Sequence, residues 1–525
     1  MIVATTAGKV QGVERGGVLQ FRAVPFARAE RFRPPEPVEP WAGVREATRF
    51  GPMAPQNKAP LESMIGGQDV PGEEDCLVLN VFTPALDDGA RPVMVWVHGG
   101  GFVSGSGHVP WYDGSNLVRG GDVVVVSINY RLGALGFLEL GHLDAALAGS
   151  GANGLRDQIA ALRWVQDNVA AFGGDPGNVT IFGESAGAMS IGALLAVPEA
   201  TGLFHKAILQ SGAASNVQRP DIAAWVTGEF LDAMRLSPGS PGGLEGLLGL
   251  PVDEVLRVQG VVETEILRGE APVVRAAGGI LAFQPTVDGS LLDGHPLTGI
   301  RAGSAAGKPL VIGTNADEWN LFHLRIRQTG PLDEARARRR LGTVVGEDRV
   351  SDVLDAYRAA RPTADVDGLV CAVMTDRVFR VPAIRLAEAQ LPHAPRVSMY
   401  RWDLGSTAFG GLLGACHAVE VPFVLGNLSR TGVDVLIGGL DEGAHAISAT
   451  SVLAWTKVAR TGDPGHEGLS WPAYDLATRS TVVLDRSPTN VDDPDGELRR
   501  LWDEIDGSER PDGATPAAPG VPGAV

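Results

Sequence analysis

The chain has 525 residues, 44% of them hydrophobic, which is enough apolar material for a large buried core. Its 44 Lys and Arg against 62 Asp and Glu give a net charge of −18. Nucleic acids and anionic lipids bind positive surfaces, so this acidic balance argues against both as partners.

The three cysteines, Cys76, Cys371 and Cys416, include no CxxC pair, which argues against a disulfide framework or a structural zinc site. The opening MIVATTAGKVQGVERGG lacks the basic stretch and apolar core of a signal peptide. No apolar run approaches the ~18 residues of a membrane-spanning helix. We therefore expect a soluble, cytoplasmic protein that does not use a membrane.

Short runs rich in Val and Ile predict parallel strands that are buried on both faces. The first two cover 92–100, PVMVWVHGG, and 122–130, DVVVVSINY. Between 154 and 174 the apolar residues recur at helical spacing, and a Gly pair ends the pattern. Further strands are predicted at 178–182, 206–210, 309–313 and 397–402. Strands that alternate with helices predict an α/β sheet.

Two more polar, helical segments interrupt this alternation, at about 219–281 and 331–391. We expect them to be helical insertions over the sheet, within a single catalytic domain that covers 1–507. Residues 508–525 are rich in Pro, Gly and Ala without periodicity, which predicts a disordered tail.

One serine is placed between two glycines where a predicted strand becomes a helix, in VTIFGESAGAMSIGALLA. A side chain exposed on such a strained turn leaves no room for bulky residues two positions before or after it, and the following helix directs its N-terminus near the serine oxygen. GxSxG alone is a weak signal in a glycine-rich chain, but this is the one match and its placement is specific. The pattern favours Ser185 as a nucleophile over a plain turn serine.

A glycine-rich loop, HGGGF at 98–102, follows the first predicted strand. Glycines let backbone N–H groups face a ligand, and loops of this type form oxyanion holes together with the N–H after the nucleophile. The predicted donors are Gly100, Gly101 and Ala186. A dinucleotide or phosphate loop is the alternative, but GGGFVSGSG matches neither pattern.

A nucleophilic serine also needs a base and an acid, and in this type of fold they follow it as acid, then histidine. His417 comes after the predicted strand at 397–402 and a glycine-rich loop, whereas His445 lies in a predicted helix and His466 in a polar turn. His417 is therefore the favoured base. Asp317 and Glu318 both follow the strand at 309–313, and the residues alone leave the acid open between them.

Several ordered stretches match a known family. They include EEDCLVLNVFTP, WVHGGGFVSGSG, NYRLGALGFL, GLRDQIAALRWVQDNVAAFGGDPGNVTIFGESAG, GTNADEW and CHAVEVPFVLGN. From about Lys9 to Tyr474 the chain resembles the type-B carboxylesterases, the group that includes the cholinesterases and the para-nitrobenzyl esterases. The resemblance implies an α/β-hydrolase fold, with a large, mostly parallel, twisted central sheet flanked by helices and helical insertions over the active site.

The resemblance also implies roles for individual residues. It names Ser185 as nucleophile, His417 as base and Glu318, rather than Asp317, as acid, and it supports the same three oxyanion donors. Glu184 would line the floor of the site. Two further candidates for the surroundings of the site are Phe102 and Ser211, of which Ser211 matches the family's buried serine that supports the triad; an ordinary core serine is the alternative.

Three departures from the family pattern bear on the expected substrate, the expected compartment and one loop. Cholinesterases carry a tryptophan about ten residues before the cysteine of EDCL, whereas MIGGQDVPGEEDC has no aromatic residue, which argues against choline esters. Secreted members pair that cysteine with an earlier one, but Ala54 stands near the expected partner position. Cys76 is then expected to be a free buried thiol, in keeping with a reducing compartment. The segment FARAERFRPPEP is shorter than its family counterpart, which leaves the nearby loop open.

The predicted activity is hydrolysis of small-molecule carboxylic esters through a Ser-His-Glu triad and an acyl-enzyme, with no cofactor and no metal. Amide, carbamate or lactone hydrolysis by the same triad is the first alternative, and a non-catalytic binding protein on the same fold is a remote one. Activity should fall as His417 protonates, near the ordinary imidazole pKa of ~6.5.

Overall fold

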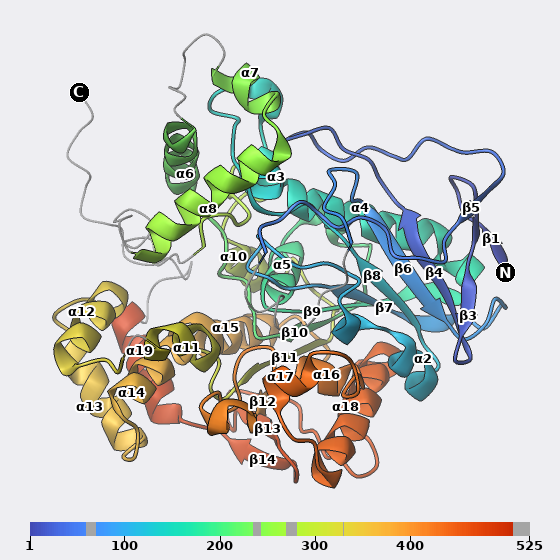
Figure 1. The fold of residues 1–525 in the computed structure, drawn as a ribbon. Coiled ribbons are helices and arrows are strands. Elements are labelled where there is room, and N and C mark those ends of the chain that lie inside the picture. The colour runs from blue at the N-terminus through green and yellow to red at the C-terminus, as the bar shows by residue number, and fades with distance from the viewer. Residues whose placement is uncertain (59–69, 235–242, 269–280, 329, 508–525) are drawn as a thin grey trace.

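A mixed sheet of eleven strands forms the centre of the molecule (Figure 1). The structure is a computed structural model and describes residues 1–58, 70–234, 243–268, 281–328 and 330–507. The spatial order of the strands is β14-β13-β12-β11-β10-β9-β7-β8-β6-β4-β3. The stretch from β8 to β13 is parallel, and antiparallel pairs complete the sheet at both edges.

The strands of this sheet are β3 (Val13–Arg15), β4 (Val18–Pro25), β6 (Val78–Thr83), β7 (Arg91–Val97), β8 (Val124–Ile128), β9 (Gly174–Glu184), β10 (Lys206–Gln210), β11 (Leu310–Asn315), β12 (Val397–Trp402), β13 (Ser480–Leu484) and β14 (Thr489–Asp492). A small second sheet near the N-terminus contains β1 (Ile2–Ala4), β2 (Lys9–Gln11) and β5 (Val44–Glu46). Each strand predicted from an apolar run is present, and all of them lie in the parallel part.

The helix predicted over 154–174 is α4 (Asn153–Asn168), which continues into a short 3₁₀ helix at Val169–Phe172. The predicted glycine pair ends it, because Gly173 adopts φ 78°, a left-handed conformation that glycine takes without a steric penalty. Gly174 already belongs to β9, so the next strand begins earlier than predicted.

The two faces of the sheet bury two separate hydrophobic cores. Alternate residues of β7 show the division: Val93 and Val95 lie in one core, and Met94 and Trp96 in the other. The first core is covered by α3 (Gly133–Phe137), α4, α5 (Ala186–Leu194), α10 (Pro296–Arg301) and α15 (Val381–Gln390). The second is covered by α2 (Ser115–Gly121), α16 (Val421–Val424), α17 (Val433–Ile437) and α18 (Glu442–Thr461).

The remaining helices form two groups away from the sheet faces, green and yellow in Figure 1. Within the range predicted as the first insertion lie α6 (Pro220–Ala233), α7 (Gly243–Leu248) and α8 (Val252–Arg268). The second group consists of α11 (Asn320–Gln328), α12 (Glu334–Val345), α13 (Val350–Ala360) and α14 (Val366–Thr375). The C-terminal helix is α19 (Gly496–Asp506). Residues 235–242 and 269–280 of the first predicted insertion, and the tail predicted at 508–525, lie outside the described residues.

In the described part of the chain, no helix combines the length and the apolar character that crossing a membrane requires.

Candidate active site

The candidate catalytic residues follow the carboxyl ends of neighbouring parallel strands. Ser185 comes directly after β9, the HGGG loop after β7, Glu318 after β11 and His417 after β12. Carboxyl ends of parallel strands lie at one edge of a sheet, the edge where open α/β folds bind their ligands. The topology therefore gathers segments that are far apart in the sequence.

Ser185 has the strained backbone expected of a strand-to-helix turn, with φ 55° and ψ −126°. Its N–H donates to the Gln210 carbonyl at 2.9 Å, and its own carbonyl accepts from Met189 N–H at 2.8 Å. A Cβ on Gly183 would lie 2.5 Å from the Val97 carbonyl oxygen, and one on Gly187 would overlap the same atom. Both glycines of the motif are therefore required by the close packing of the turn against β7.

The HGGG loop lies against this turn, since a Cβ on Gly99 would come within 3.0 Å of the Ser185 Cβ. Gly100 and Gly101 take φ values of 112° and 61°, which other residues rarely adopt. Among the hydrogen bonds of the described residues, none uses the N–H of Gly100, Gly101 or Ala186. Three backbone donors near the serine are thus left available for a ligand.

His98, the first residue of the loop, anchors it. The Tyr130 hydroxyl donates to the His98 carbonyl at 2.8 Å, and the two rings stack with centroids 4.4 Å apart. Burial lowers the pKa of His98 to about 4, so its imidazole stays neutral. These contacts of His98 hold the HGGG loop in place.

The imidazole of His417 is paired with a buried carboxylate. Its Nδ1 lies 2.6 Å from Glu318 Oε2, although 99 residues separate the two in the chain. Asn315 N–H donates to the other carboxylate oxygen of Glu318 at 2.8 Å. Asp317, the acid that the residues left open, instead accepts from Ala415 N–H at 3.0 Å and so supports the loop that carries His417.

The other imidazole nitrogen, Nε2 of His417, lies 3.1 Å from Glu184 Oε1. The Ser185 hydroxyl makes no hydrogen bond to the described residues, so His417 faces the residue before the serine in this structure. Burial raises the pKa of Glu184 to about 8. Burial alone would lower the pKa of His417, but the carboxylates of Glu184 and Glu318 outweigh it and raise that pKa to about 9.

Two aromatic rings, Phe322 and Phe379, pack on His417, with centroids 5.1 Å and 4.8 Å from the imidazole. Phe322 is 44% exposed and Phe379 is buried. Phe322 follows Glu318, the predicted acid, by four positions and could be anticipated as a neighbour of the site. Phe379 lies far from every motif, and no sequence signal pointed to it.

A further buried carboxylate lies behind the triad candidates. Glu420 accepts from Gln210 Nε2 at 3.0 Å and from Asn315 Nδ2 at 2.6 Å. Burial raises its pKa. The Gln210 carbonyl also accepts from the Ser185 N–H, and the Asn315 N–H donates to Glu318. Glu420 therefore links the residue that supports Ser185 to the residue that supports Glu318. Its position three residues after the predicted base was the only available signal.

The other residues considered from the sequence are not part of the His417–Glu318 pair. The Phe102 ring is fully buried and packs edge-on against Phe137, with centroids 5.2 Å apart. Ser211 is buried next to the site, but within the described residues its hydroxyl has no hydrogen-bond partner. His445 lies in α18, and His466 lies in a turn, where its Nε2 is 3.2 Å from the Thr450 carbonyl.

The family model described as "Carboxylesterase family" matches residues 1–499. The chain belongs to the carboxylesterase family. It is 38% identical over 511 residues to the para-nitrobenzyl esterase of Bacillus subtilis, covering 95% of this chain and 98% of that one. It is 37% identical over 504 residues to the phenmedipham hydrolase of Pseudarthrobacter oxydans, covering 92% and 94%.

A solved carboxylesterase structure from Geobacillus stearothermophilus superimposes with a TM-score of 0.84 at 40% identity, over 95% of this chain and 99% of that one. The predicted α/β-hydrolase fold is thereby confirmed. The family model and the related enzymes show that this carboxylesterase is a serine hydrolase that acts on carboxylic esters.

Proposed function

We propose that Ser185 is the nucleophile of this carboxylesterase, with His417 as general base and Glu318 as the acid that orients it. His417 Nε2 takes the proton of the Ser185 hydroxyl as the oxygen attacks the ester carbonyl. Collapse of the tetrahedral intermediate expels the alcohol, which takes up the proton from His417, and leaves an acyl-enzyme. A water activated by His417 then releases the acid and restores the serine.

The oxyanion of both tetrahedral steps binds the N–H groups of Gly100, Gly101 and Ala186 in this proposal. Donors of this kind act on charge that develops in the transition state and contribute about 3–4 kcal/mol each. Their support here is that all three lack a partner among the described residues, beside a serine in a strained turn.

The observation that carries the proposal is the 2.6 Å contact between His417 Nδ1 and Glu318 Oε2. It fixes the imidazole with its other nitrogen directed at the Glu184–Ser185 turn. In the proposed catalytic geometry the Ser185 hydroxyl donates to an unprotonated Nε2 and takes the place of the Glu184 contact, since catalytic hydrogen bonds often tighten only in the complex with substrate.

For the substrate we propose a small, uncharged ester, on the strength of the apolar rings of Phe322 and Phe379 on His417. We further propose a cytoplasmic location. Its support is that the three cysteines, all within the described residues, are buried and form no disulfide, with burial raising the pKa of the Cys76 thiol.

Turnover of p-nitrophenyl esters from acetate to decanoate by wild type and Ser185→Ala tests this function. We expect kcat to fall roughly 10⁴-fold or more in the variant for every ester, with unchanged thermal stability. The chain-length profile of the wild type then sizes the acyl pocket. Wild-type turnover in Ser185→Ala would contradict the assignment, and turnover of matched amides but of no ester would contradict the substrate class.

A further inference from the structure

A turn of π-helix, Asp376–Arg380, joins α14 to α15 beside the triad candidates. Helical turns with this wider hydrogen-bond pattern are rare and are often found at functional sites. We call this segment the π turn. It carries Phe379, whose buried ring lies 4.8 Å from the imidazole of His417, measured between centroids. Phe379 also stacks on Phe322 at 6.2 Å, with an interplanar angle of 11°.

The residue just before the π turn contacts the neighbour of Glu318. Thr375, the residue before the turn, accepts a hydrogen bond at its hydroxyl from the N–H of Trp319 at 3.0 Å. Trp319 directly follows Glu318, and its ring lies 6.5 Å from that of Phe379. One short segment therefore contacts the base through a ring and the neighbour of the acid through a hydroxyl.

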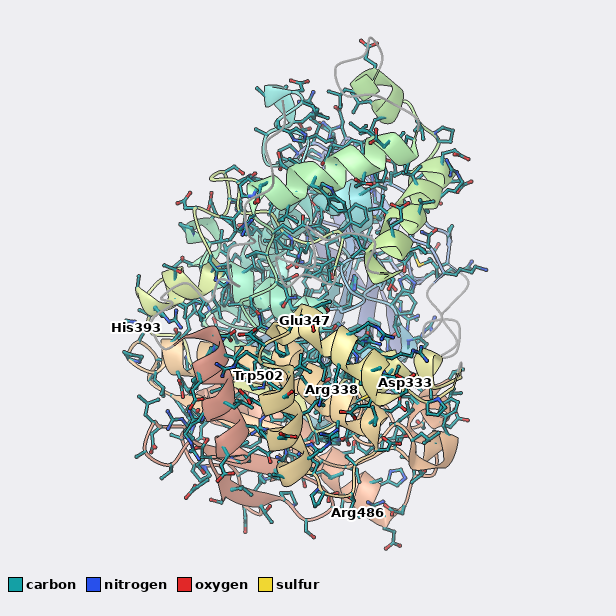
Figure 2. All side chains as sticks on the ribbon, turned by 90° about the vertical axis from the view of Figure 1, so that its left-hand side faces the viewer. Asp333, Arg338, Glu347, His393, Arg486 and Trp502 are labelled. Carbon is teal, nitrogen blue, oxygen red and sulfur yellow. The ribbon has the colours of Figure 1, made fainter. Side chains whose placement is uncertain are left out.

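A buried chain of hydrogen bonds holds the π turn from the side away from His417. Tyr357, on α13, donates its hydroxyl to Asp376 Oδ2 at 2.5 Å. Trp502, on α19, donates its indole N–H to the Tyr357 oxygen at 2.7 Å. Tyr357 and Trp502 have no exposed surface and Asp376 has 2%. Figure 2 shows Trp502 on α19, next to the helices of the second group.

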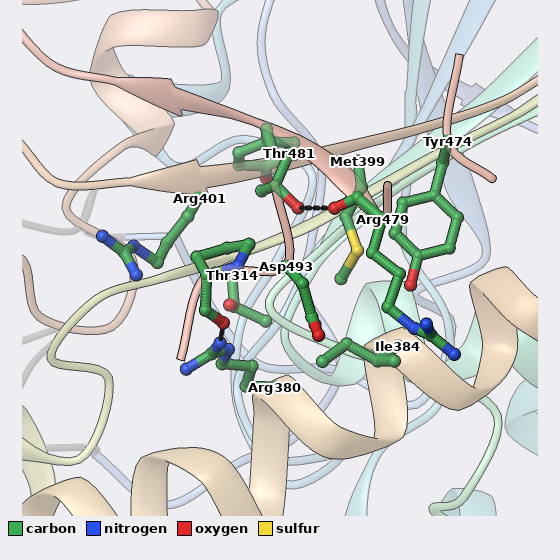
Figure 3. A pocket seen from close by; sticks show the side chains of 11 residues that line it. Thr314, Arg380, Ile384, Met399, Arg401, Tyr474, Arg479, Thr481 and Asp493 are labelled. Carbon is green, nitrogen blue, oxygen red and sulfur yellow. Dashed lines mark hydrogen bonds between the residues drawn. The ribbon is translucent and has the colours of Figure 1, made fainter. Parts of the chain in front are cut away.

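The last residue of the π turn is anchored to the segment before α19. Arg380 lies 2.7 Å from Asp495 Oδ2 and also donates to the Pro494 carbonyl. Its side chain borders a cavity of about 20 Å³ between α15 and strands β11–β13, which is about the size of one water (Figure 3). Arg380 thus points away from His417, whereas Phe379 points toward it.

We propose that the chain Trp502–Tyr357–Asp376 is a brace that keeps the π turn in its wide form and so holds Phe379 against His417. Tyr357 and Asp376 are then positioning residues for the reaction, although neither touches the substrate. The proposal rests on the proposed function, in which His417 is the base.

The physical reason is the position of Asp376. Its carboxylate is buried, and the nearest cation is Arg380 Nη1 at 3.6 Å, so the Tyr357 hydroxyl is its close donor. Burial raises the pKa of Tyr357, so its hydroxyl keeps its proton over the working pH range. Without that donor a buried carboxylate is left poorly satisfied, which destabilises the turn that presents it. A relaxed turn would rotate Phe379 away and admit water beside the imidazole.

The test compares Tyr357→Phe with Tyr474→Phe. Tyr474 is also buried, and its hydroxyl lies 3.5 Å from Glu388 Oε1. It lines the same small cavity as Arg380, but among the described residues it makes no hydrogen bond to Trp502, Tyr357 or Asp376, so it is the matched control. We expect Tyr357→Phe to lower kcat for p-nitrophenyl butyrate about fivefold to twentyfold with KM within twofold, and the control to match wild type. Trp502→Phe, which removes the donor to Tyr357, should shift kcat in the same direction by less.

A double-mutant cycle separates positioning from general stability. In Phe379→Leu, Tyr357→Phe should cause no further loss of kcat, because the contact that it supports is already gone. The proposal would be wrong if the two substitutions lowered kcat independently, so that the double variant showed the product of the two single effects. It would also be wrong if a folded Tyr357→Phe variant had the kcat of wild type. If Tyr357→Phe does not fold, the same cycle with Trp502→Phe decides in the same way. These outcomes can be told apart from a failure of the proposed function. If the proposed function were wrong, His417→Gln and Ser185→Ala would retain activity regardless of the effect of Tyr357→Phe.

Discussion

Glu184 lies close to a histidine that is distant from it in the chain. The motif places it next to the nucleophile, and the fold brings its carboxylate to 3.1 Å from His417 Nε2. An anion at that distance stabilises the imidazolium. In the proposed mechanism, Glu184 is therefore expected to influence the pH range in which His417 acts as a base.

The first prediction concerns that pH range. A general base must be neutral, so activity is lost as pH falls through the pKa of His417. Because neighbouring carboxylates raise that pKa to about 9, the acid limb of kcat/KM should lie above the ordinary imidazole pKa of ~6.5. The sequence alone predicted a limb near the ordinary pKa, and the pH profile decides between the two expectations.

Glu184→Gln removes one of those negative charges, so the acid limb should move to lower pH by about one unit. The measurement is kcat/KM for a p-nitrophenyl ester from pH 5 to pH 10, with the exposed Glu467→Gln as control. A limb that stays in place in Glu184→Gln would show that this carboxylate does not set the pKa of His417.

The second prediction concerns Glu318. Its replacement by Gln keeps the shape but offers Nδ1 a neutral partner, which stabilises the imidazolium less and can select the wrong tautomer. We expect kcat to fall by about 10²–10⁴. Asp317→Asn, which leaves the 2.6 Å pair intact, should lose far less. Steady-state kinetics of the two variants measure this difference, and equal losses would argue for Asp317 as the acid.

At the scale of elements, the strand-to-helix turn depends on how closely β9 and α5 approach β7. A Cβ at position 187 would overlap the Val97 carbonyl. Gly187→Ala should therefore destabilise the fold by about 1–3 kcal/mol and move Ser185. Gly228, inside α6 with open space around it, is the control, and Gly228→Ala should stabilise slightly, because alanine is the better helix former. Thermal unfolding and esterase activity of both variants test this.

Most strands of the parallel sheet were predictable because buried strands leave continuous apolar runs, as in PVMVWVHGG and DVVVVSINY. β13, which pairs in parallel with β12, was not predicted. The nucleophile turn and the HGGG loop carry local glycine patterns. The choice of Glu318 over Asp317 came from family resemblance, since both follow the same strand. The π turn, Phe379 and the Tyr357–Asp376 bond had no such signal, because they depend on how α13, α14 and α15 pack together and on the contact with His417, which no local residue pattern encodes.

At the scale of the whole molecule, one sheet is shared by two cores. Trp164 lies in the core on one face, and Trp455 in the core on the other. Loss of either core exposes the strands that the other needs, so we expect one cooperative unfolding transition. Far-UV circular dichroism and the fluorescence of Trp164→Phe and Trp455→Phe variants should give coincident midpoints. Two separated transitions would show that the faces unfold independently and that 1–507 is not a single unit.

The central claim is that Ser185 carries the acyl group during turnover. The most direct measurement is mass spectrometry of enzyme quenched in acid during turnover of a slowly deacylated p-nitrophenyl ester, followed by peptide mapping. We predict one added acyl group on the peptide that contains Ser185, and no such adduct in Ser185→Ala. In Glu318→Gln the acylated fraction should be higher than in wild type if deacylation slows more than acylation. The claim would be contradicted by an acyl group on another residue. It would also be contradicted by turnover under pre-steady-state burst conditions without any adduct on Ser185.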